Sequence, residues 1–148
     1  MLEDLLIITE GGQLLFSWHS EKRKEKDDDL ISGFLSALNS FATIERGEDI
    51  KSLKLKETNL IFEKNENYLQ KLTFVVTTKN EELIELLHSA IHDIMDNFIK
   101  IYANVLEREF DGEITRFNKF DPYVEEIIKS HGLDVLESSI KKLMKAES

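Results

Sequence analysis

The sequence predicts an α+β fold, an α/β sandwich in which helices cover both faces of a five-stranded antiparallel sheet. Short apolar runs of strand length recur five times, and three of them lack the alternation of a half-exposed strand. Two longer stretches repeat apolar residues every three or four positions, as amphipathic helices do. The predicted element order is ββαβββαα plus a C-terminal helix, with one helix on one face and two on the other.

The first two strands form a hairpin at residues 5–8 and 14–18. Gly11 and Gly12 supply the turn, because glycine reaches positive φ without steric cost. The unbroken apolar runs of this hairpin and of residues 72–78 predict strands covered on both faces. Such strands belong in the middle of a sheet.

The third strand, at residues 50–56, alternates apolar residues with lysines and is predicted to lie at an edge. Its Leu53 and Leu55 are expected to face inward. A fourth strand follows at residues 60–62. The expected order across the sheet is second, first, fifth, fourth, third.

Polar stretches and capping residues delimit the predicted helices. Residues 19–29 contain no apolar side chain, so they read as a loop in which Asp29 can cap a helix over residues 30–44. Asn80 can cap a long helix over residues 83–106. Asp121 and Pro122 open a helix near residues 123–129, and apolar spacing predicts a last helix from residue 133.

Composition limits the function classes. The chain has 148 residues, 41% of them hydrophobic, which suits one domain with a real core. Its formal net charge of −10 opposes binding to nucleic acid or to anionic lipid. It has no cysteine, which excludes disulfides and thiolate chemistry and fits a reducing cytoplasm.

No apolar run reaches the roughly 18 residues of a membrane span, and no basic leader precedes the first strand. We therefore expect a cytoplasmic protein that reaches membranes only through partners.

Three segments resemble the longin domain family, which includes N-terminal domains of vesicle SNAREs, small adaptor-complex subunits and sedlin-type tethering subunits. They are the LLIITEGGQLLFSW hairpin, LISGFLSALNSFA in the first helix, and FVVTTKNEEL before the second. The resemblance places a longin-like domain at residues 1–130 and a C-terminal helical extension at residues 131–148. It implies a profilin-like sandwich without catalysis or cofactor. The partners that it implies are a small GTPase, a SNARE-like segment or a sister longin or roadblock subunit.

The strongest candidate for metal chemistry is the pair His88 and His92, four residues apart on the second long helix, with Glu85 or Asp93 nearby. His92 lies far from the apolar stripe and His88 borders it, so surface positions are expected for both and no metal site is predicted. His19 and His131 receive no role. The sequence has no nucleophile elbow, P-loop or dinucleotide glycine pattern, so we expect no enzyme.

The first helix supplies the candidate binding site. Its apolar residues, such as Leu30, Phe34 and Phe41, are expected to face the sheet, which leaves an opposite half that is small and uncharged. That half consists of Ser32, Gly33, Ser36, Asn39 and Ser40. In a chain with 32% charged residues, it predicts a close contact. Three interpretations remain open. The small residues form a docking face for a partner or for a second copy of the chain in a homodimer, the C-terminal helix folds back over them, or their grouping arises by chance.

Lys51, Lys54 and Lys56 beside that helix have two interpretations. They can meet an acidic partner or anionic lipid, which adds Lys51 and Lys54 to the predicted partner-binding residues, or they keep an edge strand from pairing with other chains.

The leading hypothesis is an interaction module in membrane traffic or small-GTPase regulation. The alternatives are a small-molecule sensor, which needs a polar-lined cavity, and a roadblock-like GTPase-regulatory scaffold, which usually begins with a helix.

Overall fold

The computed structural model describes residues 2–20, 28–109 and 111–133. Its elements, in chain order, are β1 (Asp4–Thr9), β2 (Leu14–His19), α1 (Asp28–Ser40), the π-helical turn η1 (Phe41–Glu45), β3 (Ser52–Lys54), β4 (Asn59–Asn65), β5 (Leu72–Thr78), the 3₁₀ helix η2 (Glu81–Leu83), α2 (Ile84–Leu106), the 3₁₀ helix η3 (Thr115–Phe120) and α3 (Asp121–Ser130). The predicted order ββαβββαα is confirmed. The predicted C-terminal helix falls almost entirely on residues 134–148, outside the described residues.

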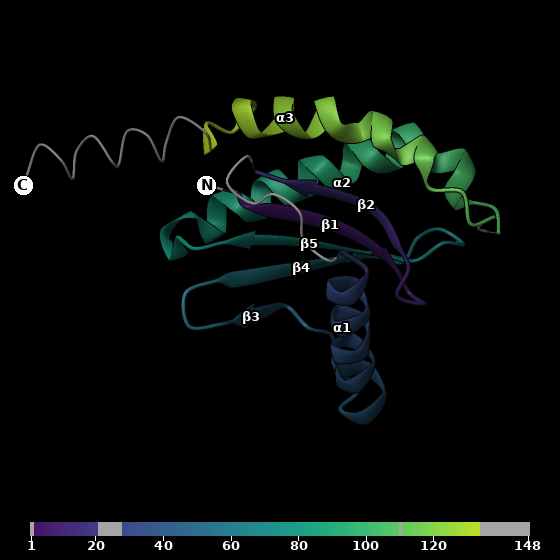
Figure 1. Cartoon of the computed structure of the whole chain (residues 1–148), viewed down its shortest axis with the longest axis horizontal. Helices are drawn as coiled ribbons and strands as arrows, with labels where there is room; N and C mark the ends of the chain where they lie inside the picture. The colour runs from purple at the N-terminus through teal and green to yellow at the C-terminus, as the bar shows by residue number, and fades with distance from the viewer. Residues whose placement is uncertain (1, 21–27, 110, 134–148) are drawn as a thin grey trace, which may run out of the picture.

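The strands form an antiparallel sheet in the order β2-β1-β5-β4-β3, as predicted (Figure 1). β1 and β5 lie side by side in the middle, and both are buried along nearly their whole length. Their unbroken apolar runs predict the central position correctly, since a central strand is covered on both faces. The same inference is wrong for β2, whose apolar run is also unbroken but which lies at the other edge of the sheet, because burial of a strand's two faces does not require a neighbour on both of its sides.

β3 lies at the edge, as expected, but it is shorter than predicted. Leu53 packs against the core beneath α1. Leu55 lies past the end of the strand, where its N–H donates to the Thr58 carbonyl across the turn into β4, and its side chain is 52% exposed. The expectation that Leu55 faces inward is therefore wrong, because the chain has already begun to turn there.

α2, η3 and α3 cover one face of the sheet, and α1 covers the other (Figure 1). The larger core lies under α2 and α3. Phe98 of α2 contacts Phe74 of β5 and Phe117 and Phe120 of η3, with ring centroids 5.1–5.8 Å apart. Packing of this kind on both faces of one sheet is a longin-like α-β-α sandwich.

Polar contacts tie the hairpin to this core. The Trp18 indole N–H of β2 donates to Glu125 Oε1 of α3 at 2.9 Å. On the neighbouring strand, buried Asp4 lies 2.7 Å from His19 Nδ1 and accepts from the Thr77 hydroxyl at 2.6 Å. Burial of a carboxylate is tolerable when hydrogen bonds satisfy it in this way.

The helix ends largely follow the sequence signals. Asn80 accepts from the Glu82 N–H at 3.0 Å and caps η2, which leads into α2. Pro122 lies in the first turn of α3. Asp29 lies within α1, whose described part starts at Asp28, and not before the helix as predicted.

Leu133 is fully buried in the larger core, on the face opposite α1. The alternative that the C-terminal stripe covers α1 gains no support from this residue, and its remaining members lie beyond the part of the chain that the structure describes. None of the described helices combines the length and the apolar composition that a membrane span needs.

Candidate functional site

α1 meets the sheet with part of its small-residue half. Ser32 and Leu35 are buried, and Ser36 is half-buried. Gly12, at the tip of the β1–β2 turn, has a φ of +91° and lies so close to Ser36 that a Cβ at position 12 would be 2.6 Å from Ser36 Oγ. Small side chains at both positions therefore allow the helix and the turn to approach closely.

This contact corrects the expected orientation of the helix. Ser32 and Ser36 face inward, whereas large apolar residues that were expected on the sheet are exposed. Phe34 is 60% exposed, Phe41 58% and Ile44 78%. The role of the small residues in partner binding stays a prediction. The expectation that they all lie on the side of α1 that faces away from the sheet is wrong for Ser32 and Ser36.

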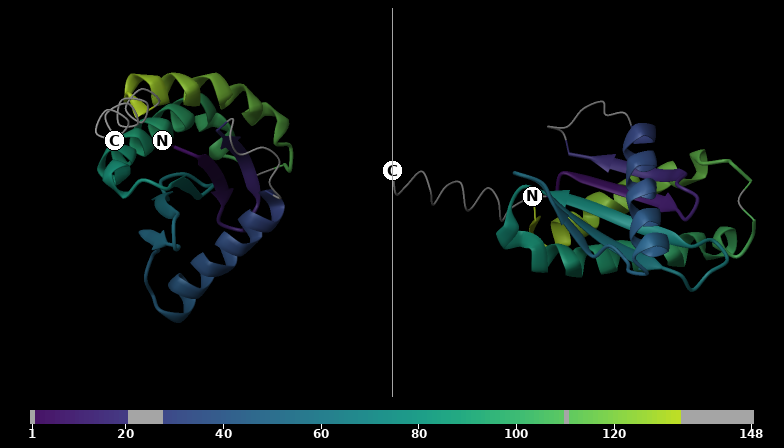
Figure 2. Two further views of the ribbon diagram at one scale, coloured as in Figure 1. Left: turned by 60° about the vertical axis from the view of Figure 1, so that its left-hand side comes forward. Right: turned by 90° about the horizontal axis from the view of Figure 1, so that it is seen from below.

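The reason lies in the course of α1 over the sheet. Among the strands, α1 packs mainly on β1 and β2, beside which it begins, and its far end stands away from the sheet (Figure 2). Residues of its second half therefore have less sheet to cover. The helical period predicts which residues share a face, but it does not fix how far along the helix that face is buried.

A groove of about 350 Å³ separates the end of α1 from β3. Leu38, Phe41 and Ala42 form one wall, and Ile50 and Leu53 form the other. Arg46, Glu48, Asp49, Lys51 and Ser52 complete the lining. The groove is thus apolar along its walls with charges of both signs at its rim.

The outer edge of β3 adjoins this groove. The Lys51 carbonyl accepts from the Phe62 N–H, and the Leu55 N–H donates to the Thr58 carbonyl. Because hydrogen-bonded and non-hydrogen-bonded pairs alternate along an antiparallel ladder, the N–H and C=O groups of Ser52 and Lys54 point away from β4. The Lys54 ammonium pairs with Glu81 of η2 instead of entering the groove. Of the two predicted lysines, Lys51 therefore lines the groove and Lys54 does not.

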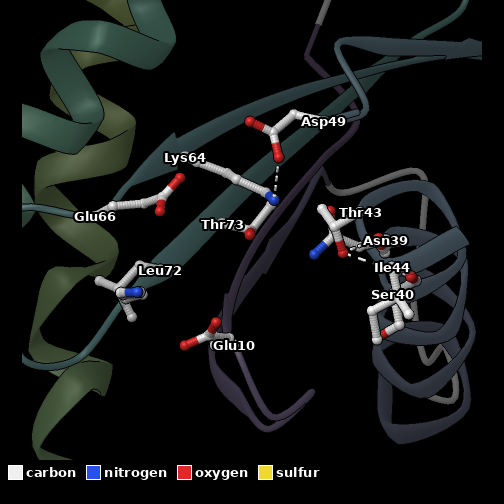
Figure 3. A pocket seen from close by; sticks show the side chains of 11 residues that line it. Glu10, Asn39, Ser40, Thr43, Ile44, Asp49, Lys64, Glu66, Leu72 and Thr73 are labelled. Carbon is white, nitrogen blue, oxygen red and sulfur yellow. Dashed lines mark hydrogen bonds and ion pairs between the residues drawn. The ribbon is translucent and has the colours of Figure 1, made fainter. Parts of the chain in front are cut away.

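The other members of the predicted site divide between two surroundings. Gly33 is exposed on α1, and no described residue outside its own stretch of helix lies within 4 Å of its Cβ position. Asn39 and Ser40 are half-buried and line a second, polar cavity (Figure 3), which shares only Asp49 with the groove. No sequence pattern indicates this cavity, because its lining comes from five separate segments of the chain.

The histidines of α2 lie at the surface, as expected. His88 Nδ1 and His92 Nε2 each lie 3.7 Å from Glu63 Oε1 of β4. Across the described ranges, no cluster of three or more histidine, aspartate or glutamate side chains is suited to hold a metal ion. His131 pairs with Asp93 at 2.5 Å, which joins α2 to the end of α3.

Neither a protein-family model nor a curated protein matches this sequence. Among solved structures, a chain from "The Structure of the Mammalian SRP Receptor" is similar with a TM-score of 0.56. The two chains are 13% identical, and the match covers 91% of this chain and 98% of that one. At this identity the likeness shows the fold alone.

Proposed function

We propose that the chain is a non-catalytic protein-interaction module of the longin type, acting in membrane traffic or small-GTPase regulation. Its docking surface is the exposed side of α1 and η1 together with the groove to β3. We propose a cytoplasmic protein that meets membranes through its partners, with no cofactor of its own.

The observation that carries this proposal is the exposure of Phe34, Phe41 and Ile44 on one helix and its continuation. Three large apolar side chains, each more than half exposed, cost solubility unless a contact uses them. The apolar walls of the adjoining groove extend the same surface toward β3.

The occupant we propose is an apolar segment of another protein, such as a small GTPase switch region or a SNARE-like helix. Two copies of this chain would each carry a net charge of −10, so long-range repulsion opposes a homodimer. The groove region is less acidic: residues 46–57 carry Arg46, Lys51, Lys54 and Lys56 against Glu48, Asp49 and Glu57. A neutral or acidic partner therefore meets less repulsion there than the net charge of the whole chain suggests.

The similar fold of a chain in the SRP receptor structure supports a binding role, since that chain belongs to a receptor. One observation also favours the alternative class of small-molecule sensor. Such a sensor needs a polar-lined cavity, and the cavity beside Asn39 and Ser40 has that character.

Binding measurements on purified proteins test the docking surface. The probes are small GTPases in their GDP and GTP-analogue forms and SNARE-motif peptides. We expect a probe that binds the natural chain to lose about tenfold or more in affinity to the double variant Phe41→Ser, Ile44→Ser, because both side chains are central anchors.

The matched control is Leu69→Ser, which removes a side chain that is 60% exposed in the β4–β5 connection, away from the groove. Its affinity should stay unchanged. Equal affinity of the double variant and the control contradicts the docking surface, and failure of every probe contradicts the choice of GTPase and SNARE partners.

A further inference from the structure

The polar cavity lies between the end of α1 and the tips of three strands (Figure 3). Asn39, Ser40 and Thr43 come from the helical side, Lys64 and Glu66 from the end of β4, and Lys71 and Thr73 from the start of β5. Its volume is about 370 Å³. Cavities that hold small molecules typically measure about 300–1,000 Å³, so this one has room for a ligand of amino-acid or dipeptide size.

The local backbone explains why the cavity exists. α1 ends in the π-helical turn η1, which carries Thr43 and Ile44 to its wall. Turns of this kind are rare and occur frequently at functional sites. The end of α1 stands away from the sheet (Figure 2), and the cavity lies between this end and the strand ends that line it.

The charges in the cavity are partly unmatched. The Lys64 ammonium is satisfied by Asp49 Oδ1 at 2.7 Å. Glu10, Glu66 and Lys71 also line the cavity, and within the described chain no salt bridge engages their side chains. This leaves two carboxylates and one ammonium available to a ligand that carries both charges.

Asn39 adds an unsatisfied acceptor. Its Oδ1 is buried and receives no hydrogen bond within the described structure. A buried acceptor without a donor is costly, so a donor from a ligand or from water is expected there. Because Asn39 also lines the cavity, a ligand ammonium is one candidate donor.

We propose that this cavity binds a small zwitterion, an amino acid or a dipeptide. Its ammonium lies toward Glu10, Glu66 and the C-terminal end of α1, where the helix dipole favours a cation. Its carboxylate pairs with Lys71 and accepts from the Thr73 hydroxyl. Ile44 offers an apolar contact for the ligand's side chain. A nucleotide is excluded, because three carboxylates line the same space.

The test is a titration of the full chain, followed by ¹H–¹⁵N NMR, with each of the standard amino acids and with Ala-Ala dipeptide. We expect saturable shifts at Thr43 and Thr73 for at least one of these probes. The same probe with its amine acetylated, or with its carboxylate converted to an amide, should bind about tenfold or more weakly, because each loses one charge contact.

Lys71→Gln and Glu66→Gln should each weaken the same probe, whereas Lys79→Gln at the opposite end of β5 should not. Thermal melts confirm that all three variants fold. No binding by any probe overturns the proposal, as does equal binding of the acetylated or amidated forms, or binding that Lys71→Gln leaves unchanged. The docking surface does not depend on this result, because none of the three substituted residues lines the groove.

Discussion

Gly12 of the β1–β2 turn and Ser36 of α1 meet so closely that a Cβ on Gly12 would lie 2.6 Å from Ser36 Oγ and 2.8 Å from Ser36 Cβ. This contact places the small residues of α1 against the hairpin. It also turns Phe34 and Phe41 outward, which is the basis of the proposed docking surface.

Gly12→Ala should lower the free energy of unfolding by about 1–3 kcal/mol, because a side chain at positive φ is strained and its Cβ would also press on Ser36. Gly11→Ala is the matched control, since the nearest atom to its Cβ position is 4.0 Å away. Urea unfolding of the two variants measures the difference. Equal stability of both variants would contradict the close contact.

Ser36→Lys should destabilise the fold by about 1–3 kcal/mol, because the longer side chain must displace the hairpin turn. Ala37→Lys, one position along on the exposed side of α1, should change stability by less than about 0.5 kcal/mol. Thermal melts compare the two variants. If Ser36→Lys instead weakened association at unchanged stability, the small residues would be the docking face after all.

Much of the fold could be predicted from the sequence because it depends on local pattern. The unbroken apolar runs of β1 and β5 place those strands centrally, and the lysines place β3 at the edge. The burial of α1 could not be predicted in the same way. Periodicity groups Phe34 and Phe41 with Leu35, which is buried. The course of the helix over the sheet, which the sequence does not reveal, leaves Phe34 and Phe41 exposed to solvent.

The candidate site was predictable in outline only. The sequence pointed to α1 and the neighbouring lysines, and the structure places Lys51 and Phe41 in the lining of the same groove. It pairs Lys54 with Glu81, which is distant in sequence, and no spacing rule reveals that contact. The polar cavity was missed for the same reason, since Glu10, Asn39 and Lys71 are joined only by the tertiary fold.

Acid should weaken the structure around η3 through Asp111. The Glu113 N–H donates to the Asp111 carboxylate at 3.0 Å, and the Arg116 guanidinium donates to its two oxygens at 2.8 and 2.7 Å. These donors hold the pKa of Asp111 below its ordinary value. A lowered carboxyl pKa contributes stability that is fully present above the unfolded-state value, and this is lost as pH falls through the folded-state value.

NMR titration of the Asp111 carboxyl carbon measures this effect directly. Arg116→Gln should move the pKa of Asp111 upward, and only part of the way, because the backbone donor of Glu113 remains. An Asp111 that titrates in the natural chain as it does in an unstructured peptide would contradict the contact.

Hydrogen exchange on the complex with a bound protein partner tests the docking surface most directly, because it shows which backbone amides the partner covers. We expect new protection over residues 34–54, from the exposed side of α1 through η1 to the outer edge of β3, with α2 and α3 unchanged. Protection confined to α2 and α3, or to the outer edge of β2, would contradict the assignment of α1 and β3 as the binding surface.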